Sequence, residues 1–184
     1  MDFSHYSDEP VQMAVDLANS FDVSSGEETL EVPADVAAFI AAHDGDWCRP
    51  GWEPEERDLH EVRALRSRLR RVFEADGDAE AAAILNGLLA DMGAVPRVSV
   101  HGTAPHLHFE SEADSPARYL GAIAAMGLSV ALIEGGFDRF GTCQSSRCDD
   151  VFVDVSRNHS RLHCSDKCTT RENVAAHRAR QRAG

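Results

Sequence analysis

Aromatic side chains are scarce in this sequence, and the common enzyme motifs are missing from it. Phe, Trp and Tyr make up 7% of the 184 residues, whereas 43% of the residues are hydrophobic. Alanine and leucine must therefore supply most of the core, and both favour helices. The sequence has no P-loop, no dinucleotide-binding glycine fingerprint and no catalytic-triad spacing. These absences predict a helix-rich protein that is not an enzyme.

The sequence also lacks a long apolar run and a basic leader. The longest apolar stretch, Ala122 to Ile133, is shorter than the roughly 20 residues that a membrane-spanning helix needs. The first residues, MDFSHYSDEPV, contain three acids and no basic region, unlike a secretory signal. We therefore expect a cytoplasmic protein. In that reducing compartment, clustered cysteines bind metal more often than they form disulfides.

Basic residues are few before position 139. Residues 1–138 carry nine Lys and Arg against twenty-six Asp and Glu, whereas residues 139–184 carry nine against five. The two segments thus have opposite charge in a chain with a formal net charge of −13. Nucleic acid attracts a basic segment and repels an acidic one. The charge split predicts two domains, 1–138 and 139–184, with different roles.

Helical periodicity dominates the first domain. Apolar spacing and Pro, Gly and Ser boundary signals predict helices over 10–21, 33–45, 54–76, 78–92 and 115–135. The last of these begins with Ser115 as the N-cap and is apolar on nearly every side, so it should be the central buried helix. Apolar and polar residues alternate on both sides of the sequence GTAP, which predicts a β-hairpin over 96–111.

Four of the five cysteines lie in the second domain, as two close pairs. Cys143, Cys148, Cys164 and Cys168 form the pattern C-x4-C-x15-C-x3-C. Paired thiolates from two local turns predict a closed, tetrahedral, structural zinc site. Between the two cysteine pairs, the segments VFVDVS and RLHC lie on either side of RNHS, which predicts a second β-hairpin. A helix should follow Cys164. A turn that carries two cysteines, then a hairpin and then a helix is the arrangement of a treble-clef zinc finger, which we predict here. For the whole chain we predict an α+β fold.

Basic residues follow one stripe of the predicted C-terminal helix. Lys167, Arg171, Arg178 and Arg182 are spaced by four, seven and four residues, and Arg157 and Arg161 lie in the adjoining insert. Such a cationic surface predicts contact with DNA phosphates. Two other interpretations stay open: a solvated tail that balances the acidic domain, and a zinc-stabilised module that binds another protein.

At these residues the chain resembles the CGNR zinc finger family. The matching residues are the four cysteines, FVDVSR at 152–157 and HCSDKCTTR at 163–171, with Thr169-Thr170 where the family has Gly-Asn. The upstream part is similar to the ABATE domain that accompanies this finger, through VDLANS at 15–20, ALRSRL at 64–69 and ILNGLL at 84–89. The resemblance implies a stress-response transcriptional regulator with a DNA-binding finger.

The first domain offers weaker candidates for binding. Asp16 and Asn19, within VDLANS, could line a pocket for a small-molecule effector, or could only cap a turn. His101, His106 and His108 could form a second metal site, although the polar face of a sheet explains them better. Cys48 has no evident base beside it and is expected to be an incidental thiol. A protein effector on this domain and an enzymatic role for it remain alternatives, and the sequence leaves the oligomeric state open.

Overall fold

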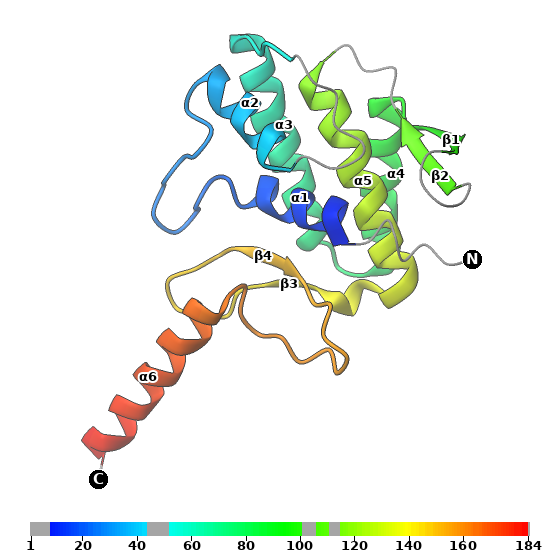
Figure 1. The fold of residues 1–184 in the computed structure, drawn as a ribbon. Coiled ribbons are helices and arrows are strands. Elements are labelled where there is room, and N and C mark those ends of the chain that lie inside the picture. Colours follow the sequence, from blue (N-terminus) through cyan, green and yellow to red (C-terminus); the bar gives the residue numbers. More distant parts are fainter. Residues whose placement is uncertain (1–7, 44–51, 101–105, 111–114, 184) are drawn as a thin grey trace.

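The computed structural model describes residues 8–43, 52–100, 106–110 and 115–183 (Figure 1). Within these ranges the helices are α1 (Asp8–Ala18), α2 (Pro33–Ala42), α3 (Glu56–Phe73), α4 (Asp78–Met92), α5 (Pro116–Gly135) and α6 (Asp166–Ala183), with a 3-10 turn, η2, at Phe137–Arg139. Two antiparallel strand pairs accompany them, β1 (Val95–Ser99) with β2 (His106–Glu110) and β3 (Phe140–Thr142) with β4 (Val151–Val153). The predicted α+β class is confirmed.

Helix α5 is the central element of the helical body, in contact with α1, α3 and α4. Leu120 and Leu128 on this helix are fully buried. Its contact with α1 is unusually close at Gly127, where a Cβ atom would lie 2.8 Å from the Pro10 Cβ and 3.0 Å from the Val11 nitrogen. The two helices reach this separation because residue 127 has no side chain.

Helix α5 also corrects one expectation from the sequence. It is long and apolar enough to cross a membrane, because the helix extends beyond Ala122–Ile133 to both Pro116 and Gly135. In the structure 72% of its apolar window is buried inside the protein. Helix α5 therefore has the burial of a core helix.

The predicted helices are all present, with differences at their ends. Helix α4 has the predicted bounds, and Gly93 after it adopts the left-handed conformation, with φ of 64°. Ser115 caps α5 as predicted, since its hydroxyl accepts the Arg118 N–H at 3.4 Å. Helix α1 stops at Ala18, three residues early, where the Ser20 hydroxyl donates to the Leu17 carbonyl at 2.8 Å.

The first β-hairpin is confirmed in the predicted place. Strands β1 and β2 pair with Val98 opposite Leu107 and Arg97 opposite His108. The backbone of His106 and His108 therefore lies on β2, but their side chains, like all of His101 and Cys48, lie outside the part of the chain that the structure describes.

The second predicted hairpin is wrong. Strand β4 pairs with β3, which precedes the first cysteine, so that Gly141 lies opposite Phe152. Residues 160–163 form no strand. The buried carboxylate of Asp154 accepts the backbone N–H of Ser156 at 2.7 Å and that of Arg161 at 2.8 Å. These bonds fold residues 154–161 into a loop and remove the Arg161 N–H from strand pairing.

The two predicted domains share one hydrophobic core. Phe140, Val151 and Val153 from the β3–β4 pair are buried in the same cluster as the helices. The ring of Phe73 on α3 lies 5.4 Å from the Phe140 ring. Helix α6 instead projects away from the body, as the lower part of Figure 1 shows. In the C-terminal segment, the β3–β4 pair is thus packed in the core, whereas α6 is not.

Candidate metal centre and basic helix

Three separate elements bring the four cysteines of the C-terminal segment together. Cys143 follows β3, Cys148 ends the turn at residues 145–148, Cys164 precedes α6 and Cys168 lies in the first turn of α6. Their four Sγ atoms all lie within 4.8 Å of one another. The Cys148–Cys164 and Cys164–Cys168 Sγ distances are 3.6 and 3.7 Å. Tetrahedral zinc with Zn–S bonds of about 2.3 Å requires sulfur atoms about 3.8 Å apart, so the cluster fits one zinc ion.

Backbone hydrogen bonds shape the loop that carries the first cysteine pair. The Cys143 N–H donates to the Asp150 carbonyl at 2.8 Å, and the Cys148 N–H donates to the Ser145 carbonyl at 3.1 Å. The Gln144 N–H donates to the Leu162 carbonyl at 2.9 Å. We call residues 143–148 the knuckle. Its turn and its link to Leu162 place both thiols beside the second pair.

The thiols differ in acidity when no metal is bound. Burial raises the pKa of Cys148 and raises the pKa of Cys164 to about 12. Burial also opposes ionisation of Cys168, but hydrogen bonds from Ser165, Cys164 and Cys148 outweigh it and lower the pKa of Cys168. Zinc binding must displace the thiol protons, since thiolates are the metal ligands.

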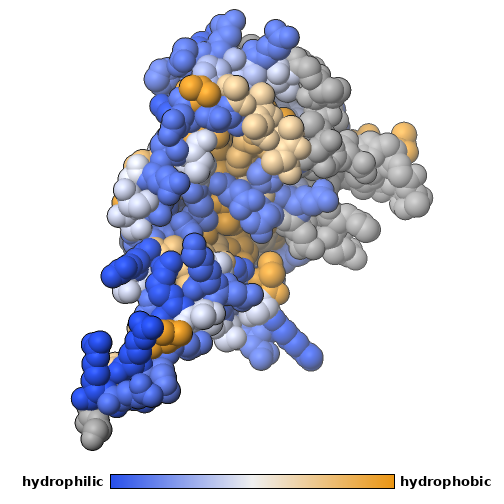
Figure 2. Space-filling view, turned by 60° about the vertical axis from the view of Figure 1, so that its left-hand side comes forward, coloured by the Kyte–Doolittle hydropathy of each residue, from blue (hydrophilic) through white to orange (hydrophobic). Residues whose placement is uncertain are grey.

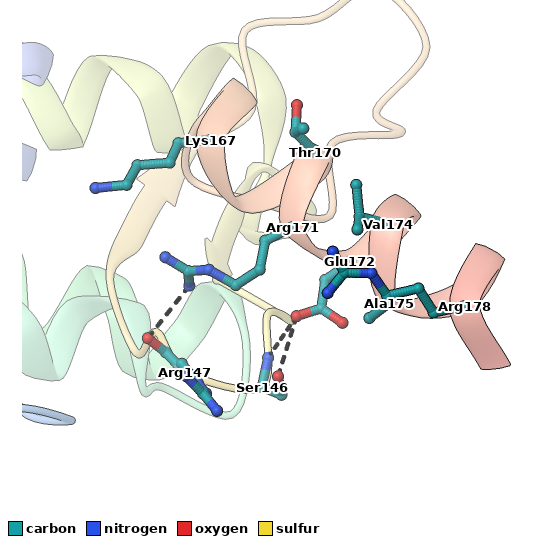
Figure 3. Close-up of a pocket in the computed structure, with 9 residues that line it drawn as sticks. All are labelled: Ser146, Arg147, Lys167, Thr170, Arg171, Glu172, Val174, Ala175 and Arg178. Carbon is teal, nitrogen blue, oxygen red and sulfur yellow. Dashed lines mark hydrogen bonds between the residues drawn. The ribbon is translucent and has the colours of Figure 1, made fainter.

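Two adjacent residues of α6 fasten the knuckle to the helix (Figure 3). The Glu172 carboxylate accepts the Ser145 hydroxyl at 2.8 Å, the Ser146 N–H at 3.0 Å and the Ser146 hydroxyl at 3.1 Å. The Ser146 N–H and then the Ser145 hydroxyl lower the pKa of Glu172. Arg171 donates to the Ser145 hydroxyl at 3.2 Å, and its Nη1 lies 3.9 Å from the Cys168 sulfur. Arg171 thus contacts one of the four candidate ligands, Cys168.

The six predicted nucleic-acid contacts separate into two groups. Lys167, Arg178 and Arg182 on α6 and Arg157 in the preceding loop are exposed. Arg171 is half-buried against the knuckle. Arg161 is exposed as well, but its guanidinium donates to the carbonyls of His163 and Cys164 and lies 5.1 Å from the Phe152 ring.

A groove between α6 and the knuckle gathers several of these cations. It has a volume of about 540 Å³, and its lining includes Arg147, Lys167, Arg171, Val174 and Arg178. Sequence reasoning missed Arg147. Its only signal was its position next to Cys148, within a metal-binding turn. In Figure 2 the helix at the lower left is mostly hydrophilic, so this end of the molecule presents charge to solvent.

The candidate effector residues of the first domain already have partners. The Asn19 amide donates to the Val151 carbonyl at 2.9 Å and accepts the Val151 N–H at 2.8 Å. The Asn19 side chain thus bonds both backbone groups of Val151 on β4, as the backbone of a paired strand would. The Asp16 carboxylate accepts from Gln12 at 2.7 Å and lies 2.9 Å from His43 Nε2. The structure does not bring Asp16 and Asn19 to a common partner.

Comparison with known protein families agrees with this arrangement. The ABATE family model, described as "Putative stress-induced transcription regulator", matches residues 12–135, and the CGNR zinc finger model matches residues 139–181. Comparison with curated proteins gives no match. The finger match and the four clustered thiols identify the cofactor as one structural zinc ion. The first model covers more than half of the chain, which therefore belongs to the ABATE family and ends in a CGNR zinc finger.

Proposed function

We propose that this protein is a zinc-stabilised, DNA-binding transcriptional regulator of the cytoplasm, with no enzymatic activity. The finger, with a treble-clef arrangement of knuckle, strand pair and helix, contacts DNA, and the helical domain receives the signal from a small-molecule or protein effector. One observation carries the proposal. Lys167, Arg178 and Arg182 lie exposed along one stripe of a helix that stands clear of the acidic body. Such a stripe suits a row of phosphates.

We propose a smaller set of DNA-contacting residues than the six predicted from the sequence. Lys167, Arg178, Arg182 and Arg157 remain in it because they are exposed and their charged groups form no hydrogen bond or ion pair with the described residues, and Arg147 joins them from the knuckle. Arg161 is omitted because its guanidinium is engaged with backbone carbonyls. Arg171 is omitted because it is held between the knuckle and Cys168.

The proposal is tested by measuring binding to a duplex of random sequence as a function of salt. The logarithm of the affinity should fall linearly with the logarithm of the salt concentration. The triple variant Lys167→Ala, Arg178→Ala, Arg182→Ala should bind more weakly, and its slope should be smaller by about one for each phosphate that the protein no longer neutralises. Wild-type protein with zinc that shows no salt-dependent binding would contradict the proposal.

A protein-interaction module is the second candidate. Val155 and Leu162 on the finger are 72% and 52% exposed, which leaves apolar surface beside the metal centre. This candidate predicts zinc binding without affinity for nucleic acid, and dissociation of a protein partner when Leu162 is changed to Ser.

A further inference from the structure

Among the residues that the structure describes, no side-chain hydrogen bond or ion pair fixes the outer half of α6 to the body. Every residue from Asn173 to Arg182 is exposed, whereas Cys168 is buried and Arg171 and Glu172 are half-buried. Helical residues 173–182 extend about 15 Å at 1.5 Å per residue. This segment contains Arg178, Arg180 and Arg182 and no acidic residue. The inner turn of α6 therefore serves the metal centre, and the outer half is available for a partner.

The finger has no exposed Phe, Tyr or Trp ring on which a single strand could stack. Between residues 139 and 184 the only Phe, Tyr or Trp residues are Phe140 and Phe152, which are 7% and 5% exposed. Proteins that bind single-stranded DNA or RNA stack bases on exposed aromatic rings. The chemistry of this surface is that of cations on a helix, which suits a duplex.

The shape of the surface distinguishes between kinds of duplex. A helix with side chains is about 10–12 Å across and enters the B-form major groove, which is about 12 Å wide. The A-form major groove of RNA is too deep and narrow for it. Val174 and Ala175 lie between Lys167 and Arg178 along the groove beside the knuckle. These short side chains allow the helix backbone to approach the bases, and apolar groups suit the thymine methyl group.

We propose that the outer half of α6 enters the major groove of B-form DNA, with Arg178 and Arg182 directed at the bases and Arg147 and Lys167 at the adjacent phosphates. This inference rests on the DNA binding proposed above and adds the form of the nucleic acid, the groove and the face of the helix. Arg180 provides the control for the face, because it lies about 200° around the axis from Arg178 and from Arg182.

The test compares full-length, zinc-loaded protein on four probes of one sequence: duplex DNA, single-stranded DNA, duplex RNA, and duplex DNA whose cytosines carry glucosylated hydroxymethyl groups. The last probe keeps the phosphates and fills the major groove. We expect the unmodified duplex to bind most tightly, and glucosylation to weaken binding at least tenfold. Netropsin, which fills the minor groove, should have no effect.

Single variants then identify the face. Arg178→Ala and Arg182→Ala should each weaken duplex binding by about 5- to 100-fold, and Arg180→Ala by much less. Zinc content and circular dichroism establish that each variant is folded. Equal binding to the glucosylated duplex, preference for single strands or RNA, or an equally large effect of Arg180→Ala would overturn the major-groove inference while leaving salt-dependent binding in place. Absence of binding to every probe would instead overturn the proposed function itself.

Discussion

Arg171 shows how a residue type can suggest one role and its position another. It belongs to the cationic stripe by sequence, yet it donates to the Ser145 hydroxyl and lies 3.9 Å from the Cys168 sulfur. A cation beside a thiolate offsets part of the charge that four thiolates bring to one zinc ion. The position of Arg171 beside Cys168 thus favours a role at the metal centre.

Changing Arg171 should therefore lower the affinity of the finger for zinc. We expect Arg171→Ala to lower zinc affinity by about 10-fold or more, and Arg171→Lys to recover part of that affinity, because outer hydrogen bonds orient and stabilise metal ligands. Competition with a chromophoric chelator measures the affinity. Lys167→Ala is the matched control, since Lys167 is exposed on the same helix. Normal zinc affinity in Arg171→Ala, with DNA binding abolished, would return Arg171 to the DNA surface.

The Asp16–His43 pair should make stability depend on pH. The hydrogen bond to Asp16 outweighs burial and raises the pKa of His43. The folded state therefore binds this proton more tightly than the unfolded state does. The pair stabilises the protein fully below about pH 6.5, and the effect is lost as pH rises through the pKa of the folded state.

The variant Asp16→Asn should thus lower the free energy of unfolding more at pH 6 than at pH 8.5. The Asp16 side chain is 42% exposed, so the difference should not exceed about 1 kcal/mol. Urea unfolding at the two pH values measures it. Asp91→Asn is the control, because its partner Arg68 is an arginine, a residue type that is always charged. Equal destabilisation by Asp16→Asn at both pH values would exclude a role for His43.

Among the elements, the α1–α5 pair depends most clearly on a single small residue. Gly127 lies against the backbone of Pro10 and Val11, and backbone cannot yield as the end of a flexible side chain can. Helix propensity alone would favour alanine at this position by about 1 kcal/mol. The contact between the helices is therefore expected to outweigh propensity.

We expect Gly127→Ala to lower the free energy of unfolding by about 1–3 kcal/mol, because the added Cβ forces α1 away from α5. Thermal and urea denaturation measure the change. Gly87→Ala is the matched control. Gly87 lies on α4 with no atom within 4 Å of an added Cβ, so this change should be neutral or stabilising. A Gly127→Ala protein as stable as Gly87→Ala would show that the α1–α5 contact is loose.

Local signals predicted the elements that depend on local structure. Helix α4 was predicted with its observed ends because Asp78 and Gly93 supply start and stop signals. The second hairpin failed because the partner of β4 lies across the knuckle, in β3. A strand pattern shows that a segment is extended, but it does not name the strand with which the segment pairs.

At the scale of the whole molecule, the buried β3–β4 pair connects the helical body to the metal centre. Asn19 binds the backbone of Val151, and Arg70 on α3 donates to the Asp149 carbonyl. Both of these bonds fall within three residues of the ligand Cys148. A shift of α1 or α3 would therefore act on the knuckle, which would give the proposed effector a physical route from the helical domain to the finger.

Removal of zinc should unfold residues 154–183 and leave the helical body folded. We expect Cys164→Ala to release the ion, and residues 154–183 to lose hydrogen-exchange protection while α3, α4 and α5 retain theirs, because the loop and α6 have little core of their own. The melting temperature of the body should fall, since Val151 and Val153 pack in its core. Cys48→Ala, which leaves the four clustered cysteines unchanged, should keep one zinc per chain. A single cooperative loss of protection in all helices would contradict the separate unfolding of residues 154–183.

The sequence by itself determined the properties carried by local pattern and composition. These are the helix-rich α+β class, the four zinc ligands in their paired spacing, and the charge contrast between body and finger. Only the tertiary structure decided which cations remain free. The guanidinium groups of Arg171 and Arg161 are hydrogen-bonded to the knuckle and to backbone carbonyls, whereas those of Arg178 and Arg182 have no such bond to the described residues. The physical reason is that helical spacing fixes which residues share a face, while the contact that a face makes depends on segments distant in sequence.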